Sequence, residues 1–279
     1  MPPCEIAQII SDSGVAKAAK SAAALFILGI LAGVYIAFAS EGSTMAAFNL
    51  LAKPETFGLG RCLAGAIFPG GLMLVVIAGG ELFTGNTMML LPLCQHRINI
   101  FGMLRNWCIV YLGNLAGSLF VAFLIYQSGQ LNGGNALLGG MTIKIAAAKC
   151  GLTFMEAFSL GILCNWLVCL AVWMAAAAKD VAGKIFAVYF PIWLFITSGF
   201  EHSVANMYYI SAGLFAAANP VWRESAMTVA KPEMLSALTW SNFFTANLLP
   251  VTLGNIVGGG LFVALAYGFA CNAFSLKNE

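Results

Sequence analysis

The stretch that decides the fold is LMLVVIAGGELFTGNTMMLLPL, residues 72–93, an apolar run with polar residues at its middle. Because glycine permits backbone angles that a helix forbids, Gly79 and Gly80 predict a break in this run. A second run, FPIWLFITSGFEHSVANMYYI at residues 190–210, is interrupted in the same way, at Gly199. Irregular backbone at membrane depth is tolerated only where protein buries it or where it lines a wet cavity. The two runs therefore predict a pair of broken helices inside a membrane protein.

The composition of the whole chain agrees with this interpretation. Of 279 residues, 61% are hydrophobic and 9% are charged, whereas a soluble domain carries about a quarter charged residues. The net charge of +2 provides no basic field, so a nucleic-acid partner is not expected. The chain has no P-loop, no G-x-S-x-G and no strand-linked G-x-G-x-x-G motif. We expect an all-α protein of the lipid bilayer that is not an enzyme and holds no cofactor or metal.

Six apolar stretches are long enough to cross a bilayer, at about 20 residues each. They predict a transmembrane domain over residues 22–279, preceded by an amphipathic surface helix over residues 1–21. An even number of crossings puts both termini on one side, and seven basic residues against six favour the cytoplasm. The predicted spans are 22–39, 62–91 (interrupted), 107–126, 154–178, 185–218 (interrupted) and 243–270.

Short motifs recur in the same order in the two halves of the chain. The first half has LGIL at 28–31, G-x-E-x(4)-N at 79–86 and LGN at 112–114; the second half has them at 160–163, 199–206 and 253–255. Because each repeat has three spans, an odd number, the second must enter the membrane from the opposite side. We expect two inverted repeats, at about 22–128 and 152–270, with a substrate path where their broken second and fifth helices meet.

The breaks carry ionisable residues that cost several kcal/mol to place in a membrane. Glu81 and Glu201 either accept hydrogen bonds from the freed main-chain amides or, for Glu201, orient the neighbouring His202. Imidazole titrates near neutral pH and can donate to an anion, so His202 is the strongest functional candidate. The helix termini at the breaks also suit a small anion.

Several other residues have two open interpretations each. Asn165 and Asn255 either line the path or make hydrogen bonds between helices. Lys149 either draws anions to a vestibule or is a solvated loop residue. Phe83 and Phe195, with Leu82, either form hydrophobic constrictions or pack in the core. The cysteines are interpreted as small hydrophobic residues rather than disulfides or metal ligands; they are Cys4, Cys62, Cys94, Cys108, Cys150, Cys164, Cys169 and Cys271.

Four segments carry a family resemblance that covers about residues 22–270. IAGGELFTGN (77–86), GILCNWLVCLA (161–171), SGFEHSVANM (198–207) and PVTLGNIVGGG (250–260) resemble the signatures of the formate/nitrite transporter family. The resemblance implies a homopentamer in the inner membrane, with an aquaporin-like pore in each protomer and cytoplasmic termini. It also implies passage of formate, nitrite, hydrosulfide and short carboxylates.

The resemblance also implies roles for single residues. Thr84 matches the family's gating-loop threonine, and His202 its central histidine, with Glu201 beside it. The remaining matches are Leu82, Phe83 and Phe195 at constrictions, Asn165 and Asn255 facing the pore, and Lys149 in a vestibule. Apart from the resemblance, the matched breaks themselves predict structural roles for Gly79, Glu81, Asn86, Gly199 and Asn206.

The predicted function is a channel or transporter for formate, passive or proton-coupled, with nitrite or hydrosulfide as the alternative substrate. In this hypothesis the anion passes one hydrophobic constriction, meets Thr84 and His202, and takes a proton before the second. A neutral-solute channel of the aquaporin type is the next alternative, although paired NPA boxes are absent. A membrane scaffold without transport leaves Glu81, Glu201 and His202 without a purpose.

Overall fold

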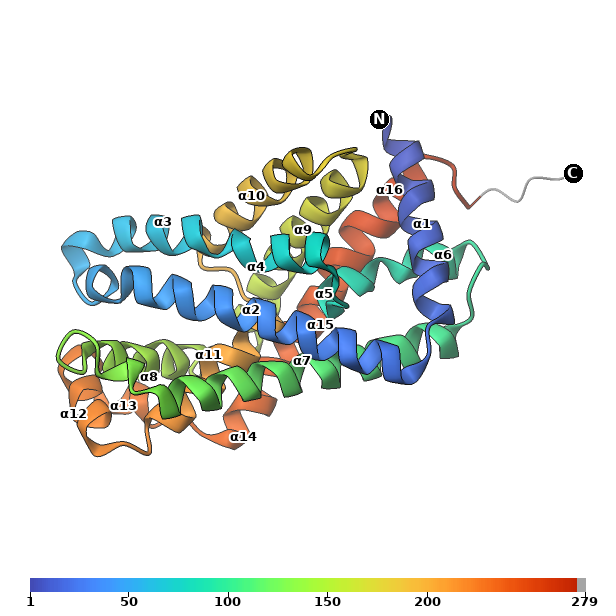
Figure 1. Ribbon diagram of the computed structural model, residues 1–279. Helices are drawn as coiled ribbons and strands as arrows, with labels where there is room; N and C mark the ends of the chain where they lie inside the picture. The colour runs from blue at the N-terminus through green and yellow to red at the C-terminus, as the bar shows by residue number, and fades with distance from the viewer. Residues whose placement is uncertain (275–279) are drawn as a thin grey trace, which may run out of the picture.

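The computed structural model describes residues 1–274, and within them every regular element is helical (Figure 1). The prediction of an all-α membrane protein with six apolar spans is confirmed: the spans are Ala22–Leu51, Pro54–Gly79, Ile100–Ser128, Phe154–Ala177, Val181–Ser198 and Trp240–Ala270. The α-helices are α1 Pro3–Ala19, α2 Ala22–Leu51, α3 Phe57–Ile67, α4 Pro69–Met73, α5 Phe83–Asn86, α6 Leu90–Cys94, α7 Ile100–Ser128, α8 Leu137–Cys150, α9 Phe154–Ala177, α10 Val181–Ser198, α11 Ser203–Ala216, α12 Pro220–Val229, α13 Pro232–Leu235, α14 Trp240–Asn242, α15 Leu249–Ile256 and α16 Ala266–Ala270. Shorter 3₁₀ turns cover Pro54–Thr56, Thr87–Met89 and Gln130–Asn132, and wider π-helical turns cover Leu74–Gly79, Phe243–Leu248 and Val257–Leu265.

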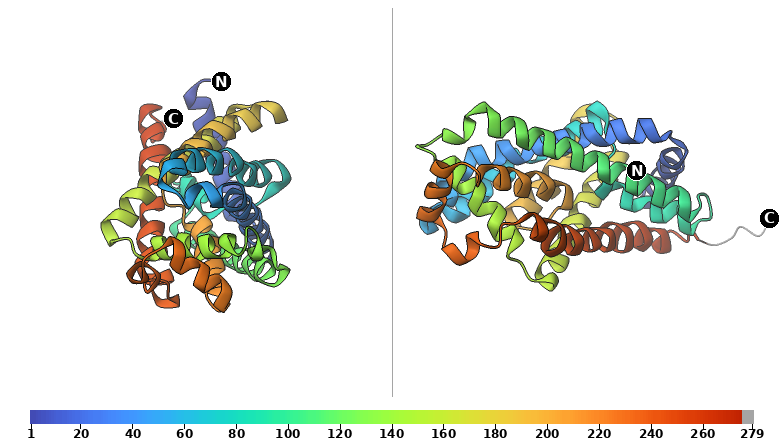
Figure 2. Two further views of the ribbon diagram at one scale, coloured as in Figure 1. Left: turned by 90° about the vertical axis from the view of Figure 1, so that its left-hand side faces the viewer. Right: turned by 90° about the horizontal axis from the view of Figure 1, so that it is seen from below.

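The long helices run side by side, and shorter helices close the two ends of the bundle (Figure 1, Figure 2). Helix α1 crosses one end, where α16 also finishes, while α12 and α13 lie at the opposite end. Helix α8 was not predicted, since its residues were assigned to the connection before the fourth span. In the structure, α8 packs along α11.

Helix α1 is fastened to the end of the bundle by polar contacts. Arg97 donates to Ser11 at 2.7 Å and pairs with Asp12 at 2.7 Å. The hydrogen bond from Arg97 holds the pKa of the Asp12 carboxyl below its ordinary value. Gly14 packs so closely on Pro92 that a Cβ there would lie 2.7 Å from its ring. One face of α1 is therefore buried against protein, while its position at a membrane surface stays a prediction.

The interpretation of the cysteines is wrong for two of the eight. Cys4, at the start of α1, forms a disulfide with Cys271, after α16, and their Cα atoms lie 5.3 Å apart. The two residues are separated by 267 positions, and only the packing of α1 across the end of the bundle brings them together. The other six are free, and Cys150, Cys164 and Cys169 are buried as expected for small apolar side chains.

Glycines set the closest helix contacts in both halves. A Cβ on Gly117 of α7 would lie 2.2 Å from the Ile30 carbonyl oxygen of α2. A Cβ on Gly258, which follows α15, would lie 2.2 Å from the Ile162 carbonyl oxygen of α9. Close approach of helices through small residues is the usual packing mode in membranes, where lipid offers no hydrophobic drive for association.

Replacing Gly117 by alanine is expected to destabilise the protein by about 1–3 kcal/mol, because the methyl group meets main-chain atoms that cannot rotate away. Gly58→Ala is the matched control, since a Cβ there has no neighbour within 4 Å. Thermal unfolding in detergent measures both variants. Equal midpoints for Gly117→Ala and Gly58→Ala would show that the α2–α7 contact tolerates a wider spacing.

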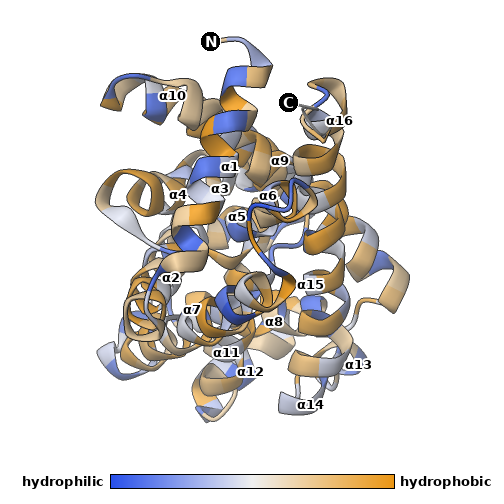
Figure 3. Ribbon diagram, turned by 90° about the vertical axis from the view of Figure 1, so that its right-hand side faces the viewer, coloured by the Kyte–Doolittle hydropathy of each residue, from blue (hydrophilic) through white to orange (hydrophobic). Residues whose placement is uncertain are grey.

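The outer faces of the spans are apolar, as lipid or protein contact requires. Figure 3, seen from the end that carries α1, shows mainly hydrophobic colours on the outer helices and polar segments towards the middle. Large apolar side chains such as Phe120, Phe186 and Phe190 are exposed on this surface. The polar residues gather inside, at the two interruptions described next.

Candidate functional site

The first interruption lies between the end of the Leu74–Gly79 turn and the start of α5 at Phe83. Gly79 takes a φ of +95°, a conformation that favours glycine. Asn114 of α7 braces the extended residues: its Oδ1 accepts from the Phe83 amide at 3.0 Å, and its Nδ2 donates to the carbonyls of Gly29 at 2.7 Å and Glu81 at 2.9 Å. The break therefore has a defined conformation, which hydrogen bonds to the neighbouring helices α7 and α2 stabilise.

The second interruption, between α10 and α11, repeats this bonding. Gly199 has a φ of +78°. Asn255 of α15 accepts from the Ser203 amide at 2.9 Å and donates to the carbonyls of Gly161 at 2.8 Å and Glu201 at 3.0 Å. Asn114 and Asn255 thus have the same role in the two halves, at the positions that the sequence repeat aligns. All three hydrogen bonds of the Asn255 side chain are made with main-chain groups. That Asn255 faces the pore stays a prediction.

The two carboxylates are buried and paired with lysines. Glu81 contacts Lys20 at 2.5 Å and Lys17 at 3.3 Å, both at the end of α1. Glu201 contacts Lys149 of α8 at 2.7 Å. The freed main-chain amides were the expected donors to these two carboxylates. Within the described residues, no main-chain amide donates to either carboxylate. Burying a charge is tolerated when it is paired and hydrogen-bonded, and these lysines supply that pairing.

Asparagines complete each ion pair in the same way. Asn86 donates to Glu81 at 2.9 Å and to Asn106 at 2.8 Å. In the second half, Asn206 donates to Glu201 at 2.6 Å and to Asn247 at 2.8 Å. Asn106 and Asn247 were not predicted. Asn247 lies inside the predicted span 243–270, where an asparagine is a signal, whereas Asn106 lies just before the predicted span 107–126. They link the networks onward to the main-chain carbonyls of Lys17 and Lys149.

The centre of the molecule brings the two breaks into contact. Thr84 Oγ1 and His202 Nε2 lie 3.0 Å apart, and both residues are almost completely buried. The other ring nitrogen, Nδ1, accepts a hydrogen bond from the Ala205 amide at 3.1 Å and so caps α11. Because an accepting nitrogen carries no hydrogen, the neutral ring holds its hydrogen on Nε2, which donates to Thr84. The Thr84 hydroxyl hydrogen is then free to be donated elsewhere.

Asn165 of α9 lies directly behind this contact. Its Nδ2 group reaches the carbonyl of Thr84 at 3.1 Å, the hydroxyl of Thr87 at 3.1 Å and the carbonyl of Asn255 at 2.6 Å. It therefore joins the loop of the first break to the helix that braces the second. This arrangement corresponds to the interhelical alternative, and a direct contact with substrate stays a prediction.

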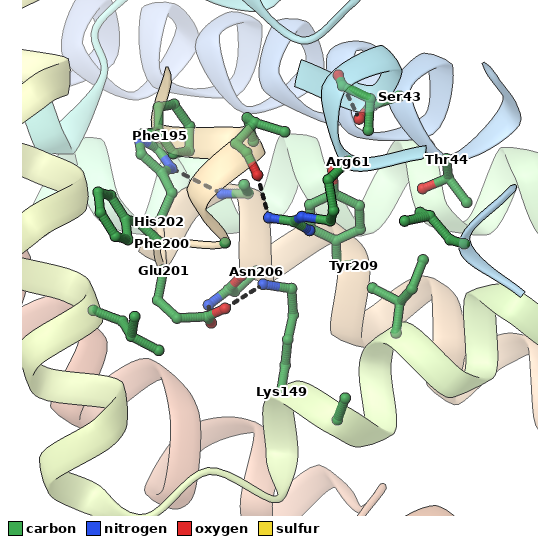
Figure 4. A pocket seen from close by; sticks show the side chains of 18 of the residues that line it. Ser43, Thr44, Arg61, Lys149, Phe195, Phe200, Glu201, His202, Asn206 and Tyr209 are labelled. Carbon is green, nitrogen blue, oxygen red and sulfur yellow. Dashed lines mark hydrogen bonds and ion pairs between the residues drawn. The ribbon is translucent and has the colours of Figure 1, made fainter. Parts of the chain in front are cut away.

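Two cavities approach the centre from opposite sides and share no lining residue. One, of about 360 Å³, is lined by Lys17, Lys20, Glu81 and Leu82. The other, of about 290 Å³, is lined by Arg61, Lys149, Phe195, Glu201 and His202 (Figure 4). Both cavities thus present cations and end at apolar side chains near the Thr84–His202 contact.

The predicted constriction residues differ in their surroundings. Leu82 lines the first cavity, and Phe195 lines the second and lies parallel to the His202 ring at 6.0 Å. Phe83 is buried edge-on against Tyr111 at 4.9 Å, so its ring packs on α7. Phe68, which was not predicted, contacts Phe195 edge-on at 5.5 Å. Their roles as barriers to a substrate stay predictions.

Lys149 and Arg61 lie in elements other than those predicted for them. Lys149 is near the end of helix α8 rather than in a loop, and its ammonium group lies 5.2 Å from the Tyr209 ring centre. Arg61 is in α3, inside the second span, and was assigned to a connection. Both point into the same cavity from different helices (Figure 4).

Comparison with known proteins agrees with this geometry. The family model described as formate/nitrite transporter matches residues 4–269. The chain belongs to this family. Among curated relatives, a probable formate transporter of Methanothermobacter thermautotrophicus is 41% identical over 281 residues, covering 96% of each chain. The formate channel FocA of Escherichia coli is 38% identical, covering 95% of this chain and 92% of the relative. The protein is therefore a multi-pass membrane protein of a transporter family.

Two solved structures match this member of the formate/nitrite transporter family over most of its length. One, described as a pentameric formate channel with formate bound, has a TM-score of 0.81 and 39% identity, covering 89% of this chain and 97% of its own. The other, described as an FNT family ion channel, has a TM-score of 0.79 and 31% identity, covering 95% and 98%. This sequence therefore adopts the fold of a known formate-channel structure.

Proposed function

We propose that the protein conducts formate and related small monovalent anions through the contact between Thr84 and His202. The observation that carries the proposal is this buried contact, which lies between two cation-bearing cavities. The relatives named formate transporter and formate channel, at 41% and 38% identity, support formate as the substrate.

Moving an anion through an apolar region costs several kcal/mol, and the protein has to offset this cost. Lysines and Arg61 in the cavities raise the local concentration of anions. At the centre, the free hydrogen of the Thr84 hydroxyl can be donated to a carboxylate oxygen. The constriction formed by Leu82 on one side and Phe195 on the other excludes larger hydrated ions.

A proton transfer at the centre would lower the cost of the last step further, because neutral formic acid crosses an apolar ring more easily than formate. His202 first takes a second proton from a hydronium ion in its cavity, which becomes water, and this proton binds Nδ1. The bond between Nε2 and its hydrogen then breaks as an O–H bond forms on formate, which leaves a neutral ring with its hydrogen on Nδ1. Loss of that proton to water and uptake of one from hydronium at Nε2 restore the resting tautomer. Protonation of Nδ1 displaces the Ala205 amide, so the start of α11 has to adjust with each transfer.

We propose the following arrangement in the membrane. The two halves, about residues 22–128 and 152–270, are inverted repeats, and the matched bracing by Asn114 and Asn255 supports this. Both termini face the cytoplasm from an inner membrane, and α1 with its two lysines lies at that end. The pentameric structural relative supports a homopentamer in which each aquaporin-like protomer has its own path.

Competition between anions in proteoliposomes tests the substrate. Flux of labelled formate is measured with nitrite, hydrosulfide or acetate added, at pH 5.5 and pH 7.5. We expect formate to be carried best and the other anions to compete for the same path. Labelled formate flux that nitrite inhibits far more strongly than the same concentration of unlabelled formate would contradict formate as the preferred substrate and favour the nitrite alternative.

A further inference from the structure

Among the described residues, the cavity on the His202 side is lined by two cations that no carboxylate balances, Arg61 and Lys144. Lys149 is paired with Glu201 at 2.7 Å, so the two charges largely cancel. Arg61 lines the same cavity and has no carboxylate within ion-pair distance among the described residues. Its guanidinium is charged at every relevant pH.

The partners of Arg61 are the main-chain carbonyls at the end of α10. Its Nε donates to the Thr197 carbonyl at 3.3 Å, and Nη2 donates to the carbonyl of Ile196. A helix carboxyl end carries about half a negative charge, and here that end lies at the break that leads to His202. Without Arg61, those carbonyls would repel an anion in the cavity that His202 lines.

The packing around Arg61 fixes its position. Gly199, at the start of the break, packs closely on the guanidinium: a Cβ there would lie 3.1 Å from Nη2, a tight contact. Trp193 Nε1 donates to the Cys62 carbonyl at 3.0 Å, joining α10 to α3 beside Arg61. The cation is therefore held at the break and does not move freely in solvent.

Within residues 1–274, an arginine bound to the carbonyl end of a broken helix is found at the second break only. The position related to Arg61 by the 120-residue spacing of Glu81 and Glu201 is Val181. At the first break, no cationic side chain of the described residues donates to the carbonyls that end the Leu74–Gly79 turn. Arg61 is therefore not a bracing residue that the two repeats have in common, as Asn114 and Asn255 are.

We propose that Arg61 is a specificity-determining residue for anions: it shares with Lys144 the net positive charge of the His202-side cavity, and it cancels the carbonyl end of α10. The inference rests on the proposed function. Its charge draws a small carboxylate or similar monovalent anion to Phe195 and does not act on a neutral solute.

Formate flux in proteoliposomes at low and high salt tests this role. The variants are Arg61→Gln, which removes the charge, Arg61→Lys, which keeps it, and Lys53→Gln, which removes an exposed cation from the connection before α3. In about 0.01 M salt, Arg61→Gln is expected to lower formate flux about tenfold, and the loss should shrink in about 1 M salt, where charges are screened within a few ångströms. Arg61→Lys and Lys53→Gln should retain most of the flux.

Two results would overturn the role of Arg61. One is a loss in Arg61→Lys as large as in Arg61→Gln, and the other is a loss that does not change with salt; each would mean that Arg61 only braces α10. Thermal unfolding of the same samples shows whether a variant has failed to fold. A wild-type protein that carries no formate would instead overturn the proposed function, and neutralising Arg61 would then have no flux to change.

Discussion

Replacing His202 by asparagine is expected to lower formate uptake at pH 5 at least about tenfold and to make the flux independent of pH from 5 to 8. Asparagine removes the titrating ring and its Nε2–H donor to Thr84. Its side-chain oxygen can still accept the Ala205 amide hydrogen, so the cap of α11 is kept. A loss of flux in this variant is therefore a loss of chemistry at the centre rather than of the fold.

The other histidine provides the control for this experiment. His96 is exposed in the connection before α7 and has a φ of +58°, which asparagine tolerates well. His96→Asn should match the wild type at every pH. If His202→Asn also kept the wild-type rate and the wild-type pH profile, proton transfer by His202 would be excluded.

The second large effect is expected at Lys149. Lys149→Met leaves the carboxylate of Glu201 buried without its cation, and breaking one side of a buried ion pair typically costs about 3–5 kcal/mol. We expect a clear fall in the thermal unfolding midpoint of the detergent-solubilised protein. The double variant Lys149→Met with Glu201→Gln should recover much of it, because a neutral amide oxygen still accepts the Asn206 hydrogen bond.

Lys144 is the matched control for Lys149. It belongs to the same helix and lines the same cavity, but it forms no ion pair among the described residues. Lys144→Met should therefore unfold close to the wild-type midpoint. Equal midpoints for Lys149→Met and Lys144→Met would show that the pair with Glu201 does not stabilise the second break.

The spans and their interruptions were predictable because their signals are local. A glycine beside a carboxylate inside an apolar run is expected chiefly where the helix breaks, and Gly79 and Gly199 take positive φ values as such a break requires. The repeat of motifs in the sequence aligns Asn114 with Asn255. The structure adds the reason for that alignment, since each asparagine braces one break.

The parts that escaped prediction depend on contacts between distant segments. Lys17 and Lys20 fit the polar face of a surface helix, yet α1 crosses the bundle and brings them to Glu81. The same crossing joins Cys4 to Cys271, which no spacing rule connects. Arg61 was assigned to a connection because charged residues usually mark span ends, and only the end of α10 explains its burial.

The central claim is that the paired breaks form a path for an anion and not for a neutral solute. It is tested most directly by measuring formate flux and glycerol flux side by side in proteoliposomes of the wild-type protein, with protein-free liposomes as the baseline. We predict saturable formate flux well above the baseline and glycerol flux close to it. Formate flux at the baseline, or glycerol flux faster than formate flux, would contradict this claim.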